Sequence, residues 1–397
     1  MKKQRTGFLL LLAVCLSIGT GRWGAWIGIP SVNFFVIDFI IFLSLVSSIT
    51  SLIRPSHLLL AFYLSCYVAL NLFMSSGYPV ATRLRDLAPF IYLIIFILLR
   101  PLILEIDETR MLSWLRGATV FSLFWNLGRS LEILNEFSLS PFTGVPVFSQ
   151  RPDQFGFVAA IGIISWGLKE CRSQKTKLSR NIIMISFLVE VALMPGRAGA
   201  IASLLGLAYV VILPGLKNLE VRRFGKKVIV GIFFVLLAGG LASNILPENS
   251  SLKRSGIVAS EGVSQIGAEG TARARLRAQV LLLNWVDENN LEFFGAGAGR
   301  EMLLESNAYK WLSGATDVRQ PHNWWVSLFS RFGLFGALLW VFATLCFIRP
   351  TKEIKAMNLR VFVLISILIS ATFGVILESP FGLIPFYFFL MRTPKKN

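Results

Sequence analysis

The sequence predicts an all-α protein, a polytopic membrane bundle of about twelve transmembrane helices. Of its 397 residues, 54% are hydrophobic and 15% are charged, and the mean hydropathy is +0.65. This is more apolar surface than a soluble core of this length can bury. The apolar residues form runs long enough for helices to cross the ~30 Å hydrocarbon layer, and these runs lack the alternating pattern of barrel strands.

Twelve apolar runs divide the chain, which we treat as one integral membrane domain over residues 1–397. The first run follows "MKKQR", as in a signal peptide, but no small-residue cleavage site follows it, so we interpret it as the first membrane helix. The runs lie near residues 7–20, 33–53, 57–74, 87–104, 111–133, 154–168, 181–194, 198–214, 228–246, 322–348, 360–377 and 381–391.

Short basic loops predict the orientation of these helices. If the N-terminus is cytoplasmic, then "KECRSQKTKLSR", "KNLEVRRFGKK", "RPTKEIKAMNLR" and the C-terminal "RTPKKN" all lie on the cytoplasmic side. The second half of the chain then obeys the positive-inside rule, whereas Arg83 and Arg85 fall outside against it. The formal net charge of +17 is therefore a topology signal and does not indicate nucleic-acid binding.

This orientation leaves a long hydrophilic segment, residues 247–321, on the extracytoplasmic side between the ninth and tenth helices. Within it, "EGTARARLRAQVLLLNWVDE" predicts an amphipathic helix with Thr271 as N-cap and with Arg273 and Arg277 on one face. Its apolar stripe is Leu276, Val280 and Leu283. Such a helix could bind phosphate through the planar arginine fork, or it could be a basic face that only touches lipid headgroups.

Two further outer residues are candidates for chemistry. Arg197 lies in the turn "LMPGRAGAIASLLG", where an arginine either reaches for lipid headgroups or pairs with a ligand. His322 is one of only two histidines and precedes an apolar run, and Asn323 could orient it for proton transfer near neutral pH. The alternative is an interfacial histidine beside the aromatic belt residues Trp324 and Trp325.

The glycines and cysteines do not predict a further binding or catalytic site. "FFGAGAGR" predicts a flexible turn at Gly295, Gly297 and Gly299, because no βαβ unit surrounds it as a nucleotide site requires. Gly333 and Gly336, three residues apart, predict a close approach between helices. The four cysteines are widely spaced and predict neither a disulfide nor a metal site, and no Walker or HExxH motif occurs.

Three of these segments together resemble the O-antigen ligase and polymerase superfamily. The spacing of His322, Asn323, Gly333 and Gly336 is similar to the signature of that family. "GRAGAIASLLGLAYVV" is similar to its arginine-containing turn and the helix that follows, and "RARLRAQVLLLNWVDENNLEFFGAGAGR" to its outer arginine, tryptophan and Gly-x-Gly segment. The resemblance covers roughly residues 150–345, in the order of the family. "PGRAG" departs from it, since relatives commonly carry Ser or Thr before the arginine.

The resemblance implies a glycosyltransferase of the bacterial inner membrane that uses no metal and no cofactor. It would move a glycan from undecaprenyl diphosphate to an acceptor sugar hydroxyl on the periplasmic face, amid membrane lipids, with a glycolipid or glycan as acceptor. His322 would be the general base, with Asn323, Gly333 and Gly336 in supporting roles. The diphosphate would bind Arg197 and Arg273, or Arg275 or Arg277 in place of Arg273 because the register of that helix is open.

The motifs leave three functions open. A ligase attaches the finished chain to a lipid A core sugar, whereas an O-antigen or exopolysaccharide polymerase joins lipid-linked repeat units, and we slightly favour the ligase. A secondary transporter or lipid flippase would also need about twelve helices, but such proteins commonly show internal repeats and broken helices near mid-membrane. The sequence shows no clear repeat, and its unusual polar residues gather at the outer face.

Overall fold

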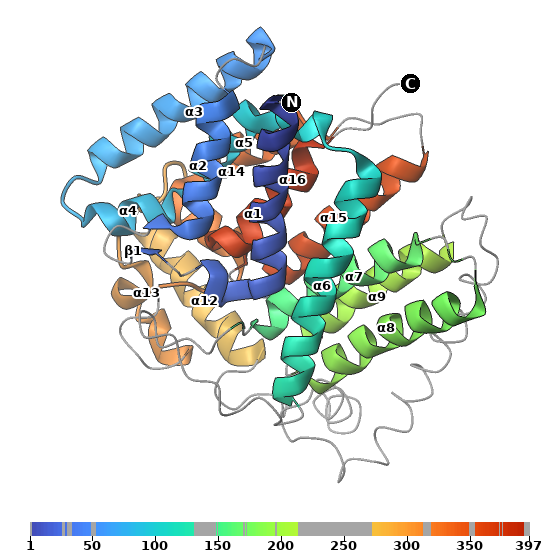
Figure 1. Cartoon of the computed structure of the whole chain (residues 1–397). Helices are drawn as coiled ribbons and strands as arrows, with labels where there is room; N and C mark the ends of the chain where they lie inside the picture. Colours follow the sequence, from blue (N-terminus) through green and yellow to red (C-terminus); the bar gives the residue numbers. More distant parts are fainter. Residues whose placement is uncertain are drawn as a thin grey trace.

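The described part of the chain is almost entirely helical (Figure 1). The computed structural model describes residues 2–25, 28–29, 34–48, 53–130, 148, 150–169, 171, 173–194, 197–212, 272–312, 319–348, 354–372, 374 and 376–392. These residues form 14 α-helices, two short 3-10 helices, and two strands of two residues each, β1 (Gly28–Ile29) and β2 (Phe34–Phe35), which pair antiparallel. The predicted all-α class is therefore confirmed.

Eleven of the twelve predicted apolar runs coincide with a described helix, and the run near residues 228–246 lies outside the described residues. These helices are α1 (Lys2–Ala25), α2 (Val36–Ser48), α3 (Pro55–Met74), α5 (Ala88–Glu105), α6 (Glu108–Ser130), α7 (Pro152–Gly167), α8 (Gln174–Leu193), α9 (Arg197–Ile212), α14 (Trp324–Leu345), α15 (Ile354–Thr372) and α16 (Pro380–Met391). The others are α4 (Val80–Asp86), α12 (Ala272–Glu288), α13 (Met302–Glu305), η2 (Ala308–Trp311) and η3 (Ile376–Glu378).

Among the described helices, three are long and apolar enough to cross a membrane: α3, α5 and α14. Shorter apolar helices lie at Gly7–Gly21, Val36–Ser47, Gly199–Val210, Arg360–Thr372 and Pro380–Met391. The structure thus supports a membrane protein, while the number of about twelve crossings stays a prediction.

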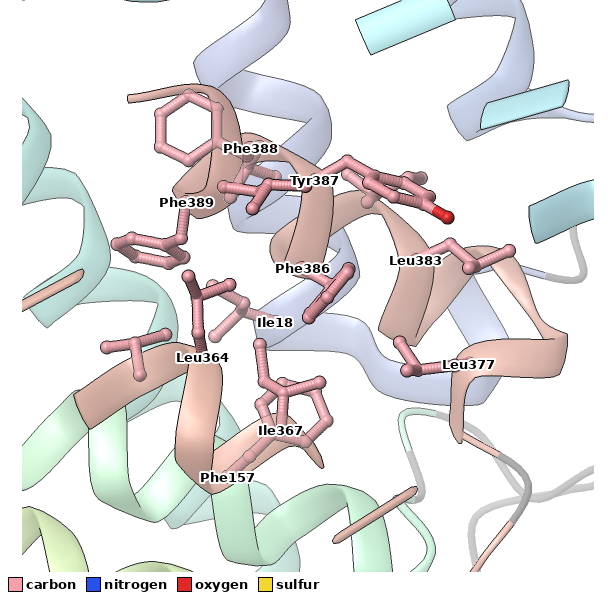
Figure 2. Close-up of a cluster of buried hydrophobic side chains, with 14 of the residues drawn as sticks. Ile18, Phe157, Leu364, Ile367, Leu377, Leu383, Phe386, Tyr387, Phe388 and Phe389 are labelled. Atoms are coloured by element: carbon pink, nitrogen blue, oxygen red, sulfur yellow. The ribbon is translucent and has the colours of Figure 1, made fainter. Parts of the chain in front are cut away.

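The core of the bundle surrounds α16, whose residues from Phe381 to Met391 are all buried. Figure 2 shows side chains of α1, α7 and α15 around it, including Ile18, Phe157 and Leu364. The Tyr387 hydroxyl donates to the Pro89 carbonyl (2.6 Å) and accepts from Trp340 (2.8 Å). A helix that is apolar on every face is explained by this burial within protein.

The described helix ends form two groups. In the first, Arg100 of α5 contacts His57 at the start of α3, and Arg392 after α16 donates to carbonyls at the end of α5. In the same group, Arg360 of α15 donates to the carbonyl of Phe347, just after α14, and to the carbonyl of Leu390, in the last turn of α16. The second group joins the ends of α3 and α4 to the starts of α5 and α14, and it includes Gln320 and Trp324, which lie two residues before and after His322.

Small residues bring the starts of α7 and α9 together. A Cβ atom at Gly156 would collide with the backbone of Gly199, and one at Gly199 would lie 2.6 Å from the Pro152 carbonyl oxygen. Such close backbone approach is typical of membrane helices that pack through small residues. The first turn of α9, which begins at Arg197, therefore lies against the first turn of α7.

Gly333 breaks α14 instead of lining a helix contact. Its φ is +63°, and a Cβ there would collide with the backbone of Phe293. The turn formed by residues 292–297 fills the break: Leu334 N donates to Glu292 O (2.7 Å) and Ala296 N to Ser330 O (2.9 Å). Gly336, by contrast, allows Tyr67 of α3 to approach closely. The two glycines that sequence spacing paired thus have different roles.

Asp86, at the end of α4, connects these elements. Its buried carboxylate accepts from Arg331 in α14, from Gly299 N (2.9 Å) and from Arg85 (3.1 Å). Arg331 also donates to the carbonyl of Arg319 (2.9 Å), which lies in the irregular segment that leads to His322. Gly299 follows the 292–297 turn directly, so one carboxylate holds the turn, the broken helix and the approach to His322.

We expect Asp86→Ala to lower the free energy of unfolding by roughly 3–5 kcal/mol, because the substitution leaves the Arg331 guanidinium buried without its anion. The matched control is Glu305→Ala, which removes the partner of Arg300 from a half-exposed pair and should cost at most about 1 kcal/mol. Denaturation with sodium dodecyl sulfate in mixed micelles, followed by tryptophan fluorescence, measures both. An equal loss of unfolding free energy in the two variants would show that Asp86 stabilises the fold no more than the half-exposed Glu305 does.

Candidate functional site

His322 lies directly before α14 in a constrained backbone. Its φ is +55°, a region that non-glycine residues seldom adopt. Asn323 follows as the N-cap, and its side-chain oxygen accepts from the backbone N–H groups of Trp325 (3.0 Å) and Val326 (3.4 Å). Cap and positive φ together turn the chain sharply into the helix, which leaves the half-buried imidazole at its entrance.

Gln279 of α12 holds this turn from the other side. Its amide nitrogen donates to the Pro321 carbonyl (3.3 Å), and its amide oxygen accepts from Asn323 Nδ2 (3.5 Å). The residues before and after His322 are therefore both bonded to one side chain. Nothing in the sequence pattern identifies Gln279, because the contact joins residues more than forty positions apart.

Two arginines act on the imidazole. Burial, the largest cause, and the charges of Arg275 in α12 and Arg151 before α7 together lower the pKa of His322 to about 4. His322 is therefore neutral at pH 7, and a neutral imidazole has one ring nitrogen that can accept a proton. Its Nδ1 is buried and has no hydrogen-bond partner among the described residues.

The structure settles which described arginine of α12 acts on His322. Arg275 does so and shares a helix face with Gln279 four residues later. Arg277 instead stacks on Trp311, with its Cζ atom 4.6 Å from the ring centre. Arg273 is the second residue of α12, and the placement of its side chain lies outside the described residues.

Arg197 is the first residue of α9, and its side chain likewise lies outside the described part. Its backbone is nevertheless placed by the contact between Gly199 and Gly156, which brings the start of α9 to the start of α7. Arg151 caps that same end of α7, where it pairs with Asp153 (3.4 Å). Gly199, two residues after Arg197, thus lies against Pro152, the residue that follows Arg151.

The amphipathic helix predicted in the outer segment is present as α12, and Thr271 lies outside the described residues. The predicted apolar stripe lies on the exposed side of this helix, and a different face is buried within the protein. Ala278, Leu282 and Trp285 pack against α13 and η2, whereas Leu276, Val280 and Leu283 are exposed. The buried face orients Arg275 and Gln279 toward the start of α14.

A narrow polar pocket lies beside His322 at Gln320 and Trp324. Arg85, Asp86, Arg331 and Glu378 also line it. Burial raises the pKa of Glu378 to about 7, and the charge of Arg331 opposes this shift. One sequence signal points to this pocket: Arg85, which the predicted orientation places outside against the positive-inside rule, pairs with the buried carboxylate of Asp86.

The chain matches no protein-family model and no curated protein. The resemblance to the O-antigen ligase and polymerase superfamily therefore depends on the quoted motifs alone.

The pKa of His322 can be measured directly because the chain contains two histidines. In histidine-labelled protein, with the signals assigned through His57→Gln, we expect the His322 resonance to titrate near pH 4. Arg275→Gln should raise this midpoint toward 6.5, and Arg277→Gln should leave it unchanged. An equal shift in both variants would contradict the assignment of Arg275.

The lowered pKa of His322 also makes the free energy of unfolding depend on pH. Unfolded His322 binds a proton near pH 6.5 but the folded residue only near pH 4, so the free energy of unfolding should fall as the pH drops between these values. Above pH 6.5 this contribution is constant.

Proposed function

We propose that the protein is a membrane glycosyltransferase of the O-antigen ligase type. It would move a glycan from undecaprenyl diphosphate to a sugar hydroxyl on the periplasmic face, from a single membrane domain of about twelve crossings. The observation that best supports this is a neutral histidine acted on by arginines from separate elements, Arg275 and Arg151, with the start of α9 packed against Pro152, the residue after Arg151.

The arrangement suits departure of a diphosphate. Arginine forks bind the donor diphosphate and neutralise the charge that grows as the bond between the anomeric carbon and the phosphate oxygen breaks. The acceptor hydroxyl oxygen attacks that carbon and its proton passes to His322, while undecaprenyl diphosphate leaves. One such in-line step inverts the anomeric configuration. The arginines supply the charge that a divalent ion supplies elsewhere, which agrees with a donor site needing no metal.

Binding of the donor would also activate the base. Arg275 and Arg151 disfavour the protonated form of His322, and a bound diphosphate cancels part of their charge. The imidazole then becomes a stronger base when the leaving group is in place. This coupling supports a base that works only on the loaded enzyme.

The grouping of helix ends supports the proposed orientation. His322 and the arginines around it belong to one group, and the starts of α3 and α15 with the end of α16 belong to the other. This is the separation that two cytoplasmic termini and a periplasmic active site in the bacterial inner membrane require.

A polymerase that joins lipid-linked repeat units uses the same chemistry and is the second candidate. A deletion strain separates the two by its surface glycan. Loss of glycan from the lipid A core, with long lipid-linked chains retained, supports the ligase. A glycan shortened to one repeat supports the polymerase. Unchanged glycan synthesis with the donor trapped on the cytoplasmic face would support a flippase instead.

In transfer assays with purified lipid-linked donor, we expect His322→Ala to lower kcat by ~10²–10⁴-fold, because the attacking hydroxyl loses its proton acceptor. Arg197→Ala should weaken donor binding at unchanged protein level, since a diphosphate contact is lost. Lys310→Ala, on the exposed surface of η2, is the control and should retain the parent rate. Full activity of the histidine variant would exclude His322 as the base, and unaltered donor affinity would return Arg197 to a headgroup contact.

A further inference from the structure

The two halves of α14 face different surroundings. Before Gly333 the helix buries polar as well as apolar residues, among them Ser327, Ser330 and Arg331. After Gly333 an apolar stripe is exposed along one side of the helix, which fits contact with lipid. This stripe consists of Leu334, Phe335, Leu338, Phe342 and Leu345.

The exposed half alone is too short to cross the hydrocarbon layer. From Leu334 to Ile348, the last residue before the basic loop, the chain has fifteen residues, which would span roughly 22 Å even if all were helical at ~1.5 Å per residue. The hydrocarbon is ~30 Å thick, so it extends about five residues further, to around residue 329. The outer hydrocarbon boundary then lies beyond the break at Gly333.

The 292–297 turn occupies that depth. Besides the two bonds described above, Phe335 N donates to Phe293 O (3.0 Å) and Gly297 N to Arg331 O (2.8 Å). Non-helical backbone at membrane depth is tolerated only where protein satisfies its polar groups, and these four bonds do so on both sides of the break. The turn and the broken helix therefore satisfy each other's backbone hydrogen-bonding groups.

The two aromatic side chains of this turn face outward. Phe293 and Phe294 are 67% and 74% exposed, and the Phe294 ring lies 6.3 Å from that of Phe335 in the lipid-facing stripe. We propose that residues 292–297 form a re-entrant membrane turn, and that Phe293 and Phe294 contact lipid acyl chains in the outer leaflet. This revises the expectation that residues 247–321 lie wholly outside the membrane.

Continuity with a second membrane helix favours lipid as the occupant. The Phe335 ring lies 5.9 Å from Tyr67 of α3, a helix whose apolar residues are largely exposed up to Phe73 and Met74 at its outer end. The aromatic surface of the turn therefore extends the surface that α3 and α14 already present. Two phenylalanine rings left in water would forgo the favourable removal of their apolar surface from water.

Spin labelling in lipid vesicles tests the depth. Phe294→Cys, Leu338→Cys and Asn307→Cys are made in the full chain with its four native cysteines replaced by serine, labelled with a nitroxide, and reconstituted in phosphatidylcholine and phosphatidylglycerol. Leu338 is the lipid-facing control, and Asn307 is an exposed polar control in the same outer segment. Collision rates with oxygen and with a water-soluble nickel complex are compared.

We expect the label at position 294 to collide with oxygen at least several-fold more than with the nickel complex, as the label at 338 does. A nickel-dominated result like that at 307 would overturn the proposal, as would spin–spin broadening that shows a second copy of the chain against the turn. If the cysteine variant loses the thermal transition of the parent, a photoreactive phenylalanine analogue at position 294 replaces it. Crosslinks to lipid then support the proposal, and their absence, with crosslinks retained at 338, opposes it.

Discussion

The Asp86 carboxylate is the interaction on which the outer end of the molecule depends. A buried carboxylate and a buried guanidinium are each costly, and the pair is tolerable only when the remaining oxygens and nitrogens are also bonded. Asp86 meets this condition through Arg331, Arg85 and the Gly299 amide, and Arg331 meets it through the Arg319 carbonyl. The need to satisfy two charges thus fixes four segments that are distant in the sequence.

The break in α14 is linked to these interactions of Asp86 and Arg331. An unbroken helix would carry its own hydrogen bonds through Gly333 and leave the 292–297 turn without partners. With Arg331 held to Asp86, the helix opens at the glycine, where φ of +63° is accessible, and the turn supplies the missing donors and acceptors. Gly295 of the "FFGAGAGR" run allows the turn to approach the broken helix, because a Cβ there would collide with the Arg331 backbone. It is a packing residue of a membrane-depth turn, and no phosphate is needed to explain it.

The sequence predicted what depends on local pattern. Apolar runs located eleven described helices, because lipid-length hydrophobic segments are a strong signal, and His322 and Asn323 were found through their place before such a run. What the sequence did not predict depends on contacts between distant residues. The buried face of α12 could not be read from its period, since both Ala278 and Val280 lie on apolar stripes of helical spacing. Gln279 and Arg151 belong to no motif, and only three-dimensional proximity to His322 marks them.

These distant contacts give the site its electrostatic character. A histidine at the membrane interface would ordinarily titrate near pH 6.5, so part of the population would be protonated and unable to accept a proton. Burial and two nearby cations remove that fraction. In the proposed function the same cations bind the donor diphosphate, and by linkage a bound diphosphate also favours the proton on His322. If the proposed function holds, His322 resists protonation in the empty site and accepts a proton once the anionic donor is bound, which is the order of events that glycosyl transfer to a hydroxyl requires.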